Sequence, residues 1–123
     1  MMRKQKNNFL QEMALSSMKR LEKNKANKSE EDLLRICEGI KRKPPLEFQS
    51  GFIFITEIKK TSPSLGEISK PEFNLFEQAE TYVNNGSNVI SVLTEPSKFS
   101  GSLQDLNDIS KTFSGTPTMR KDF

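Results

Sequence analysis

The segment that decides the fold is 52-FIFITEIK-59, an apolar run that ends in charged residues. Such a run is typical of a strand buried on both faces of a sheet. Residues 89–93 (VISVL) predict a second strand, and residues 118–121 (TMRK) begin a third. Because helical segments separate the three strands, the sequence predicts an α/β fold with a parallel sheet.

Capping residues predict the two helices between these strands. Asn74 begins the first helix, and Asn85-Gly86 ends it with a left-handed residue. Ser102 begins the second helix, and both caps are followed by an acidic residue at the third position. The expected strands begin about 36 and 29 residues apart, a spacing that indicates successive βα units. The apolar stripes of the two helices comprise Phe76, Ala79 and Val83, and Leu103, Leu106, Ile109 and Phe113.

The residues ahead of the first strand predict two more helices. Apolar residues at helical spacing predict a helix over 9–23, and the polar stretch 24–28 breaks the pattern. Ser29 offers the N-cap of a second helix. Cys37 lies in the apolar stripe of that helix, so we expect it to be a core thiol rather than a nucleophile.

The domain boundary is expected at Pro44-Pro45, which ends the helical region. It separates a helical extension, 1–46, from the strand-containing region, 47–123. The extension has 12 basic and 6 acidic residues, a net charge of +6, and the second region has a net charge of −3. A basic arm for nucleic acid or a membrane surface is one interpretation. Interleaved acidic residues and few aromatic residues favour a solvated helical surface, without nucleic-acid or membrane partners.

Composition excludes several classes of chemistry. The 123 residues include no histidine, which removes Ser-His-Asp and Cys-His catalysis and histidine-ligated zinc. The single cysteine excludes a disulfide framework and a multi-thiolate metal site. No apolar run approaches 18 residues, so we expect no transmembrane helix. Acid–base chemistry must therefore use Lys, Glu, Asp or Tyr.

Three charged residues follow the apolar strands: Glu57, Lys59 and Lys121. The carboxyl ends of parallel strands carry the functional site in α/β folds. Side chains alternate along a strand, so Glu57 and Lys59 should face the same side. One interpretation is a catalytic cluster, and the other is a structural ion pair or ordinary solvation at the strand ends. The loop 60–66 is a weaker candidate for binding an anion through its backbone N–H groups.

Several motifs, in order, resemble those of the indole-3-glycerol-phosphate synthase family. Together they cover residues 43–123 closely, and the helical extension more loosely. These motifs are 43-KPPLEF-48, 55-ITEIKKTSPS-64 with Gly66, 90-ISVLTE-95, 99-FSGSL-103 and 119-MRKDF-123.

The resemblance implies a (βα)8 barrel with an N-terminal helical extension. It also implies a decarboxylating lyase of tryptophan biosynthesis that acts in the cytoplasm. The family converts a phosphorylated small molecule, 1-(2-carboxyphenylamino)-1-deoxyribulose 5-phosphate, to indole-3-glycerol phosphate, CO2 and water. It needs no metal or organic cofactor.

The resemblance also implies roles for individual residues. Lys121 matches the general acid that protonates the substrate carbonyl oxygen as the ring closes. Lys59 matches a lysine that binds anionic groups of the substrate and is also a candidate proton donor. Glu57 matches a carboxylate that orients a lysine and takes part in proton transfer. The residues expected at the substrate are Ser62, in the loop, and Leu93, Phe99 and Phe123, around the aromatic ring.

The sequence departs from the family pattern in length. It ends on the third of eight expected strands, and a complete barrel needs on the order of 250 residues. We therefore expect an incomplete barrel, the N-terminal part of a synthase. The alternative is a non-catalytic half-barrel that needs a complementary chain. Expected partners are the missing C-terminal half or other enzymes of the pathway.

Overall fold

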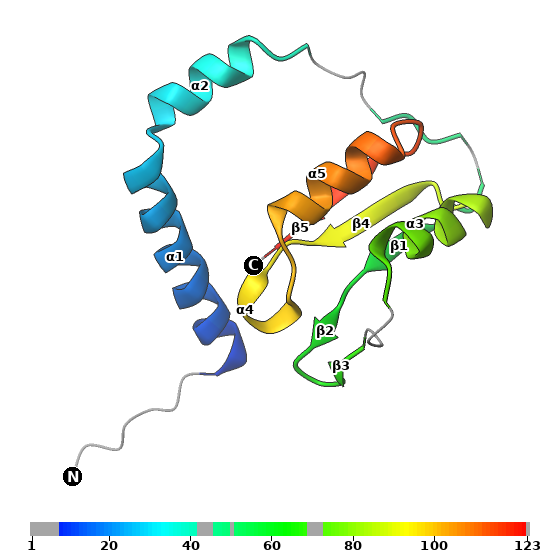
Figure 1. The fold of residues 1–123 in the computed structure, drawn as a ribbon, viewed down its shortest axis with the longest axis horizontal. Helices are drawn as coiled ribbons and strands as arrows, with labels where there is room; N and C mark the ends of the chain where they lie inside the picture. The colour runs from blue at the N-terminus through cyan, green and yellow to red at the C-terminus, as the bar shows by residue number, and fades with distance from the viewer. Residues whose placement is uncertain (1–7, 42–45, 50, 69–72, 123) are drawn as a thin grey trace. The chain divides into compact units, whose positions relative to one another are not determined.

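The structure is a computed structural model that describes residues 8–41, 46–49, 51–68 and 73–122. The chain divides into two compact units, one ending at Pro45 and one running from Leu46 to Asp122 (Figure 1). The expected helix stop at Pro44-Pro45 and the candidate site residue Phe123 lie outside the described residues. Among those residues, no helix is both long and apolar enough to cross a lipid bilayer.

Helix α1 of the first unit, Phe9–Asn27, is four residues longer than the sequence pattern predicted. Its start is fixed by a capping box: the Asn8 side chain accepts from the Gln11 N–H at 2.9 Å, and the Gln11 side chain accepts from the Asn8 N–H at 3.0 Å. The predicted end at residue 23 was wrong. Residues 24–27 contain no glycine or proline, and polarity alone does not end a helix.

Helix α2, Glu30–Glu38, begins at Ser29, as predicted. The Ser29 hydroxyl accepts from the Asp32 N–H at 3.1 Å. The prediction that Cys37 is a core thiol was wrong, because Cys37 is exposed and α2 buries none of its residues. Helical spacing of apolar residues shows that a helix is amphipathic, but it does not show that another element covers the apolar side.

The second unit is built on the predicted parallel sheet. Its strands are β1, Ile55–Ile58, β4, Val89–Leu93, and β5, Thr118–Lys121, in the order β1-β4-β5. Glu57 pairs with Ser91, and Leu93 pairs with Lys121. Helix α3, Leu75–Asn84, connects β1 to β4, and helix α5, Leu103–Thr112, connects β4 to β5. The alternation of strands and helices is therefore confirmed.

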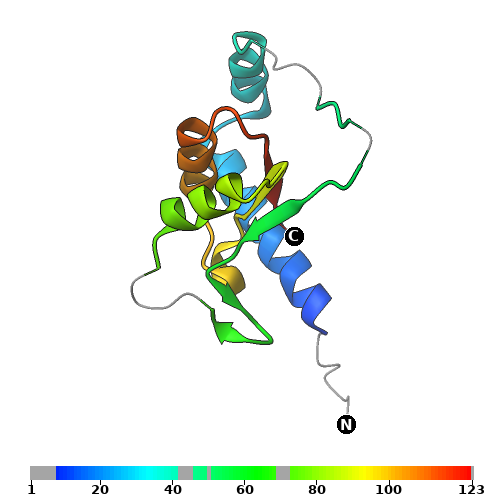
Figure 2. The ribbon, with the colours of Figure 1, turned by 90° about the vertical axis from the view of Figure 1, so that its right-hand side faces the viewer.

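Both helices lie on one side of the strands (Figure 2). The predicted caps begin them: Asn74 accepts from the N–H groups of Phe76 and Glu77, and Ser102 accepts from the N–H of Asp105. Between the helices and the sheet lies the apolar core of this unit. Its buried members are Ile58, Ala79, Ile90, Val92 and Ile109.

The prediction that the run 52–58 is a strand buried on both faces was wrong. The strand begins only at Ile55, and Phe52 is 92% exposed. β1 lies at an edge of this sheet, and α3 and α5 cover one face of it. All five residues of β4, the central strand, are buried.

Two short elements follow the strands in places where the sequence analysis expected plain loops. After β1, the strands β2, Thr61–Ser62, and β3, Gly66–Glu67, form an antiparallel hairpin. After β4 comes the single turn α4, Pro96–Phe99. The chain leaves α4 through Gly101, where a Cβ atom would lie 2.1 Å from the Leu93 carbonyl oxygen.

Candidate active site

The sheet face opposite α3 and α5 carries the candidate catalytic residues. Ile58, Ile90 and Val92 pack in the core, so the residues that alternate with them face the other side. The register arranges that side in rows across the strands. One row contains Glu57, Ser91 and Met119, and in the next row Leu93 pairs with Lys121. Lys59 directly follows the end of β1.

Glu57, Lys59 and Lys121 meet in one cluster. Lys121 Nζ donates to Glu57 Oε2 at 2.6 Å, and Lys59 Nζ lies 2.8 Å from Glu57 Oε1. Their side chains are 27% (Glu57), 30% (Lys59) and 47% (Lys121) exposed. Both carboxylate oxygens therefore have a cationic partner, while solvent still reaches each charge. This arrangement is compatible with both interpretations, a structural ion pair and a catalytic cluster.

The two lysines control the charge of Glu57. Partial burial by itself would raise the pKa of Glu57, because it removes water from the carboxylate. Hydrogen bonds from Lys121 and Lys59, together with their positive charges, outweigh burial and hold this pKa below the ordinary value of a glutamate. Glu57 is therefore an anion at neutral pH and can orient both ammonium groups.

The next residue, Lys60, is paired elsewhere. Lys60 Nζ lies 2.8 Å from Asp105 Oδ2 at the start of α5, so adjacent lysines have different carboxylate partners. Behind β1, a cleft of about 510 Å³ is lined by Glu57, Lys59 and residues of α3. Tyr82 lines this cleft, and its hydroxyl donates to the Glu57 carbonyl oxygen at 3.0 Å. Within the described parts of the chain, no three acidic or thiol groups are placed to hold a metal ion.

Ser62 lies in the hairpin after β1 rather than in the ion cluster. It is buried, and its hydroxyl is 3.0 Å from that of Ser64. Its neighbour Thr61 donates to the Lys98 carbonyl oxygen at 3.0 Å and lies 3.1 Å from the Ser100 hydroxyl. These contacts attach the hairpin to the segment that follows β4.

Leu93 and Phe99, the other described candidates, are both buried. Leu93 shares a row with Lys121, and Phe99 is the last residue of α4. Glu95, which the site prediction missed, caps this turn and is fully buried. Its carboxylate accepts from the N–H groups of Ser97 at 2.9 Å and Lys98 at 2.7 Å. A glutamate directly before a proline that begins a helix is the signal that could have found it.

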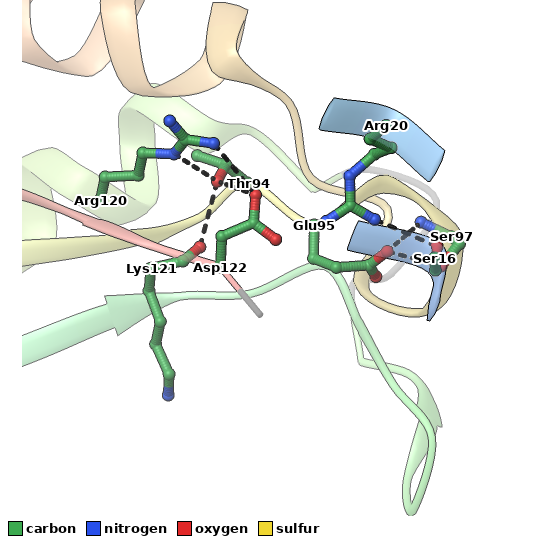
Figure 3. A network of polar contacts seen from close by, with 8 residues as sticks. All are labelled: Ser16, Arg20, Thr94, Glu95, Ser97, Arg120, Lys121 and Asp122. Atoms are coloured by element: carbon green, nitrogen blue, oxygen red, sulfur yellow. Dashed lines mark hydrogen bonds and ion pairs between the residues drawn. The ribbon is translucent and has the colours of Figure 1, made fainter. Parts of the chain in front are cut away.

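A second missed group fixes the backbone that carries Lys121 (Figure 3). The Thr94 N–H donates to the Lys121 carbonyl oxygen at 2.8 Å, and the Thr94 hydroxyl lies 3.1 Å from the same oxygen. Arg120 Nε donates to the Thr94 hydroxyl at 3.3 Å, and Arg120 forms an ion pair with Asp122 at 3.2 Å. The Arg120 and Lys121 side chains point to opposite sides of β5 in Figure 3. Lys121 therefore pairs with Glu57 and takes no part in the Arg120–Asp122 ion pair.

A family model described as indole-3-glycerol phosphate synthase matches residues 2–123 of the chain. The chain belongs to this family. The parallel sheet with two helices on one face agrees with part of the barrel that the indole-3-glycerol phosphate synthase family implies.

Curated indole-3-glycerol phosphate synthases are similar over most of the chain. The protein of Ruminiclostridium cellulolyticum is 40% identical over 120 residues, covering 94% of this chain and 45% of that protein. The protein of Endomicrobium trichonymphae is 39% identical over 120 residues, covering 94% of this chain and 46% of that protein. A shorter match to the protein of Aliarcobacter butzleri is 54% identical over 69 residues, covering 56% of this chain and 26% of that protein. At its widest, the match spans about half the length of these relatives.

Proposed function

We propose that the protein carrying this chain is an indole-3-glycerol-phosphate synthase, a decarboxylating lyase of tryptophan biosynthesis in the cytoplasm. Its substrate would be 1-(2-carboxyphenylamino)-1-deoxyribulose 5-phosphate. The observation that carries the proposal is the Glu57 carboxylate held by Lys59 and Lys121, two lysines that follow or end parallel strands. Family membership supports the same reaction.

In this proposal, each of the three charged residues has a different role. Lys121 is the most exposed of the three, and its ammonium donates a proton to the substrate carbonyl oxygen as the new ring bond forms. CO2 then leaves and the carbonyl oxygen has become a hydroxyl group. This hydroxyl takes up a second proton and departs as water, while the carbon beside the nitrogen loses a proton as the indole double bond forms. Lys59 binds an anionic group of the substrate by charge and hydrogen bonding.

Glu57 holds the two ammonium groups in place and directs them toward the substrate. Its lowered pKa supports this part of the proposal, because a neutral carboxyl group would attract lysines only weakly. Leu93 and Phe99 provide apolar surface for the aromatic ring, and Ser62 belongs to a hairpin that lies near the substrate. We also assign Phe123 to the wall around the ring, by resemblance.

A further part of the proposal concerns what covers the sheet face that carries the ion cluster. Ile55 is 53% exposed on this face, and Met119 is 41% exposed. Exposed apolar side chains beside a charged cluster favour coverage by further strands of a barrel, either from the same polypeptide or from a complementary chain. Size-exclusion chromatography with light scattering of the natural-length protein distinguishes these sources, because a complementary chain adds its own mass.

The function is tested with the natural-length protein and the proposed substrate. We expect formation of indole-3-glycerol phosphate, followed by indole fluorescence, together with release of CO2. Mass spectrometry of the product checks that one CO2 and one water have been lost. Absence of both products under conditions in which the protein is folded would overturn the proposed function.

A further inference from the structure

Ser91, in the middle of β4, has a buried hydroxyl that the proposed chemistry does not use. The residue is 2% exposed, and its Oγ atom has no hydrogen-bond partner among the residues that the structure describes. Its neighbours Ile90 and Val92 pack in the core against α3 and α5, so Ser91 faces the side of the ion cluster. A buried hydroxyl without a partner is unfavourable. We therefore looked for a second state of the site in which the Ser91 hydroxyl forms a hydrogen bond.

The sheet register shows which group could pair with Ser91. In its row, Ser91 lies between Glu57 on β1 and Met119 on β5. Neighbouring strands lie about 4.8 Å apart, so a glutamate side chain can span the gap to a serine on the next strand. A carboxylate is a far stronger acceptor than a thioether. Glu57 is therefore the natural partner for the Ser91 hydroxyl within its row.

The ion cluster explains why this bond is absent. Glu57 is on β1 and Lys121 is on β5, so their 2.6 Å contact crosses the central strand that carries Ser91. Lys59 occupies the second carboxylate oxygen at 2.8 Å. With both oxygens held by lysines, the Glu57 carboxylate has no need of the serine. Movement of Lys121 away from Glu57 frees one oxygen and opens the space above β4.

We propose that Ser91 is a positioning residue, whose hydroxyl donates to the Glu57 carboxylate when Lys121 turns from Glu57 to the substrate. The hydroxyl replaces the lost donor, so Glu57 stays charged and directed at the cluster during the reaction. The contact is a property of the fold, and only its consequence for catalysis rests on the proposed function.

A stability cycle tests the contact without any substrate. In the otherwise wild-type protein, Ser91→Ala removes an unpaired hydroxyl, so we expect the melting temperature to stay the same or rise. In a Lys121→Met background, in which Glu57 has turned to Ser91, the same change should lower it by about 2–4 °C. Lys121→Ala serves as a second background if the methionine variant does not fold.

A matched cycle controls for general effects of losing an ion pair. Lys60→Met removes a comparable pair, Lys60 with Asp105, away from Ser91. Adding Ser91→Ala to this variant should change stability as it does in the wild type. Equal effects of Ser91→Ala in the Lys60 and Lys121 backgrounds would overturn the proposal.

Kinetics test the consequence for catalysis. With 1-(2-carboxyphenylamino)-1-deoxyribulose 5-phosphate, Ser91→Ala should lower kcat about tenfold with little change in KM. Ser91→Thr, which keeps the hydroxyl, should restore most of the rate. A rate loss in both variants, or in neither, would overturn the catalytic role of the hydroxyl. If the wild-type protein shows no turnover, the proposed function fails, while the stability cycle still decides whether Ser91 and Glu57 pair.

Discussion

The two faces of the small parallel sheet use the same strands for different purposes. On the face toward α3 and α5, Ile58, Ile90 and Val92 form an apolar core with helix residues. On the opposite face, one position along the chain, the same strands carry an ion cluster and the Ser91 hydroxyl, which has no partner within the described parts of the chain. The comparison teaches that alternate residues of one strand can be assigned to stability or to chemistry by the face they occupy.

The largest expected effect comes from breaking the core face. Ile90 is fully buried there, so Ile90→Ala should lower the free energy of unfolding by about 2–5 kcal/mol, through lost contacts and a cavity. Chemical denaturation of the natural-length protein measures this loss. Met119→Ala, on the opposite face, is the matched control and should cost less, because Met119 is 41% exposed. Equal losses would mean that the two faces do not differ as described.

The next largest effect is on catalysis and comes from replacing Lys121 on the opposite face of the sheet. Loss of a general acid typically lowers the rate by at least about 100-fold, so Lys121→Ala should lower kcat by this factor. Steady-state kinetics with the proposed substrate measure it. Lys111→Ala, at the end of α5, controls for removal of a lysine and should leave kcat near the wild-type value. Wild-type kinetics in Lys121→Ala would remove Lys121 from the catalytic group.

Lys59 sharpens the comparison, because its expected effect is on binding. Lys59→Ala removes a charged donor to the substrate, so KM should rise by about tenfold. The adjacent lysine provides the control, since Lys60 pairs with Asp105 outside the cluster. Lys60→Ala should change KM much less. A similar rise in both variants would show that general positive charge, rather than the position of Lys59, binds the substrate.

The smallest effect is the pH dependence of stability from Glu57. Its pKa in the folded protein is lowered, so its stabilising contribution is present above the pKa of an unfolded glutamate. That contribution is lost as the pH falls through the lower, folded-state pKa. The destabilisation caused by Glu57→Gln should therefore be largest near neutral pH, at about 1 kcal/mol or less, and vanish in acid.

Thermal unfolding of the two proteins across this pH range measures the difference. Glu80→Gln, on an exposed part of α3, provides the control for removing a carboxylate from this unit. A constant difference between wild type and Glu57→Gln at all pH values would contradict the assignment.

How far the sequence could predict this molecule depends on how local each feature is. The caps at Ser29, Asn74 and Ser102 were predictable, because a cap needs only a side chain and the N–H groups two or three residues later. The meeting of Glu57 with Lys121 was also within reach, since strand parity and order place them together.

Other features depend on surroundings that a single sequence does not show. Phe52 and Cys37 were predicted to be buried from apolar patterns alone, and the structure exposes both. In the sequence, Ser91 is simply one polar residue within an apolar strand. Its significance depends on the register that sets it beside Glu57, and on a lysine from a third strand that occupies this carboxylate.

Gly101 shows that a position can be restricted for reasons unrelated to catalysis. Its missing side chain lets the chain return against the backbone of β4, where the Leu93 carbonyl oxygen would lie 2.1 Å from any Cβ. Backbone atoms cannot move aside as a flexible side chain can. By contrast, a Cβ at Gly115 would meet nothing within 4 Å. In a saturation library selected for folding, position 101 would accept only glycine, whereas position 115 would accept many residue types. Sequence statistics would then give Gly101 as much information as a catalytic lysine, although its cause is purely steric.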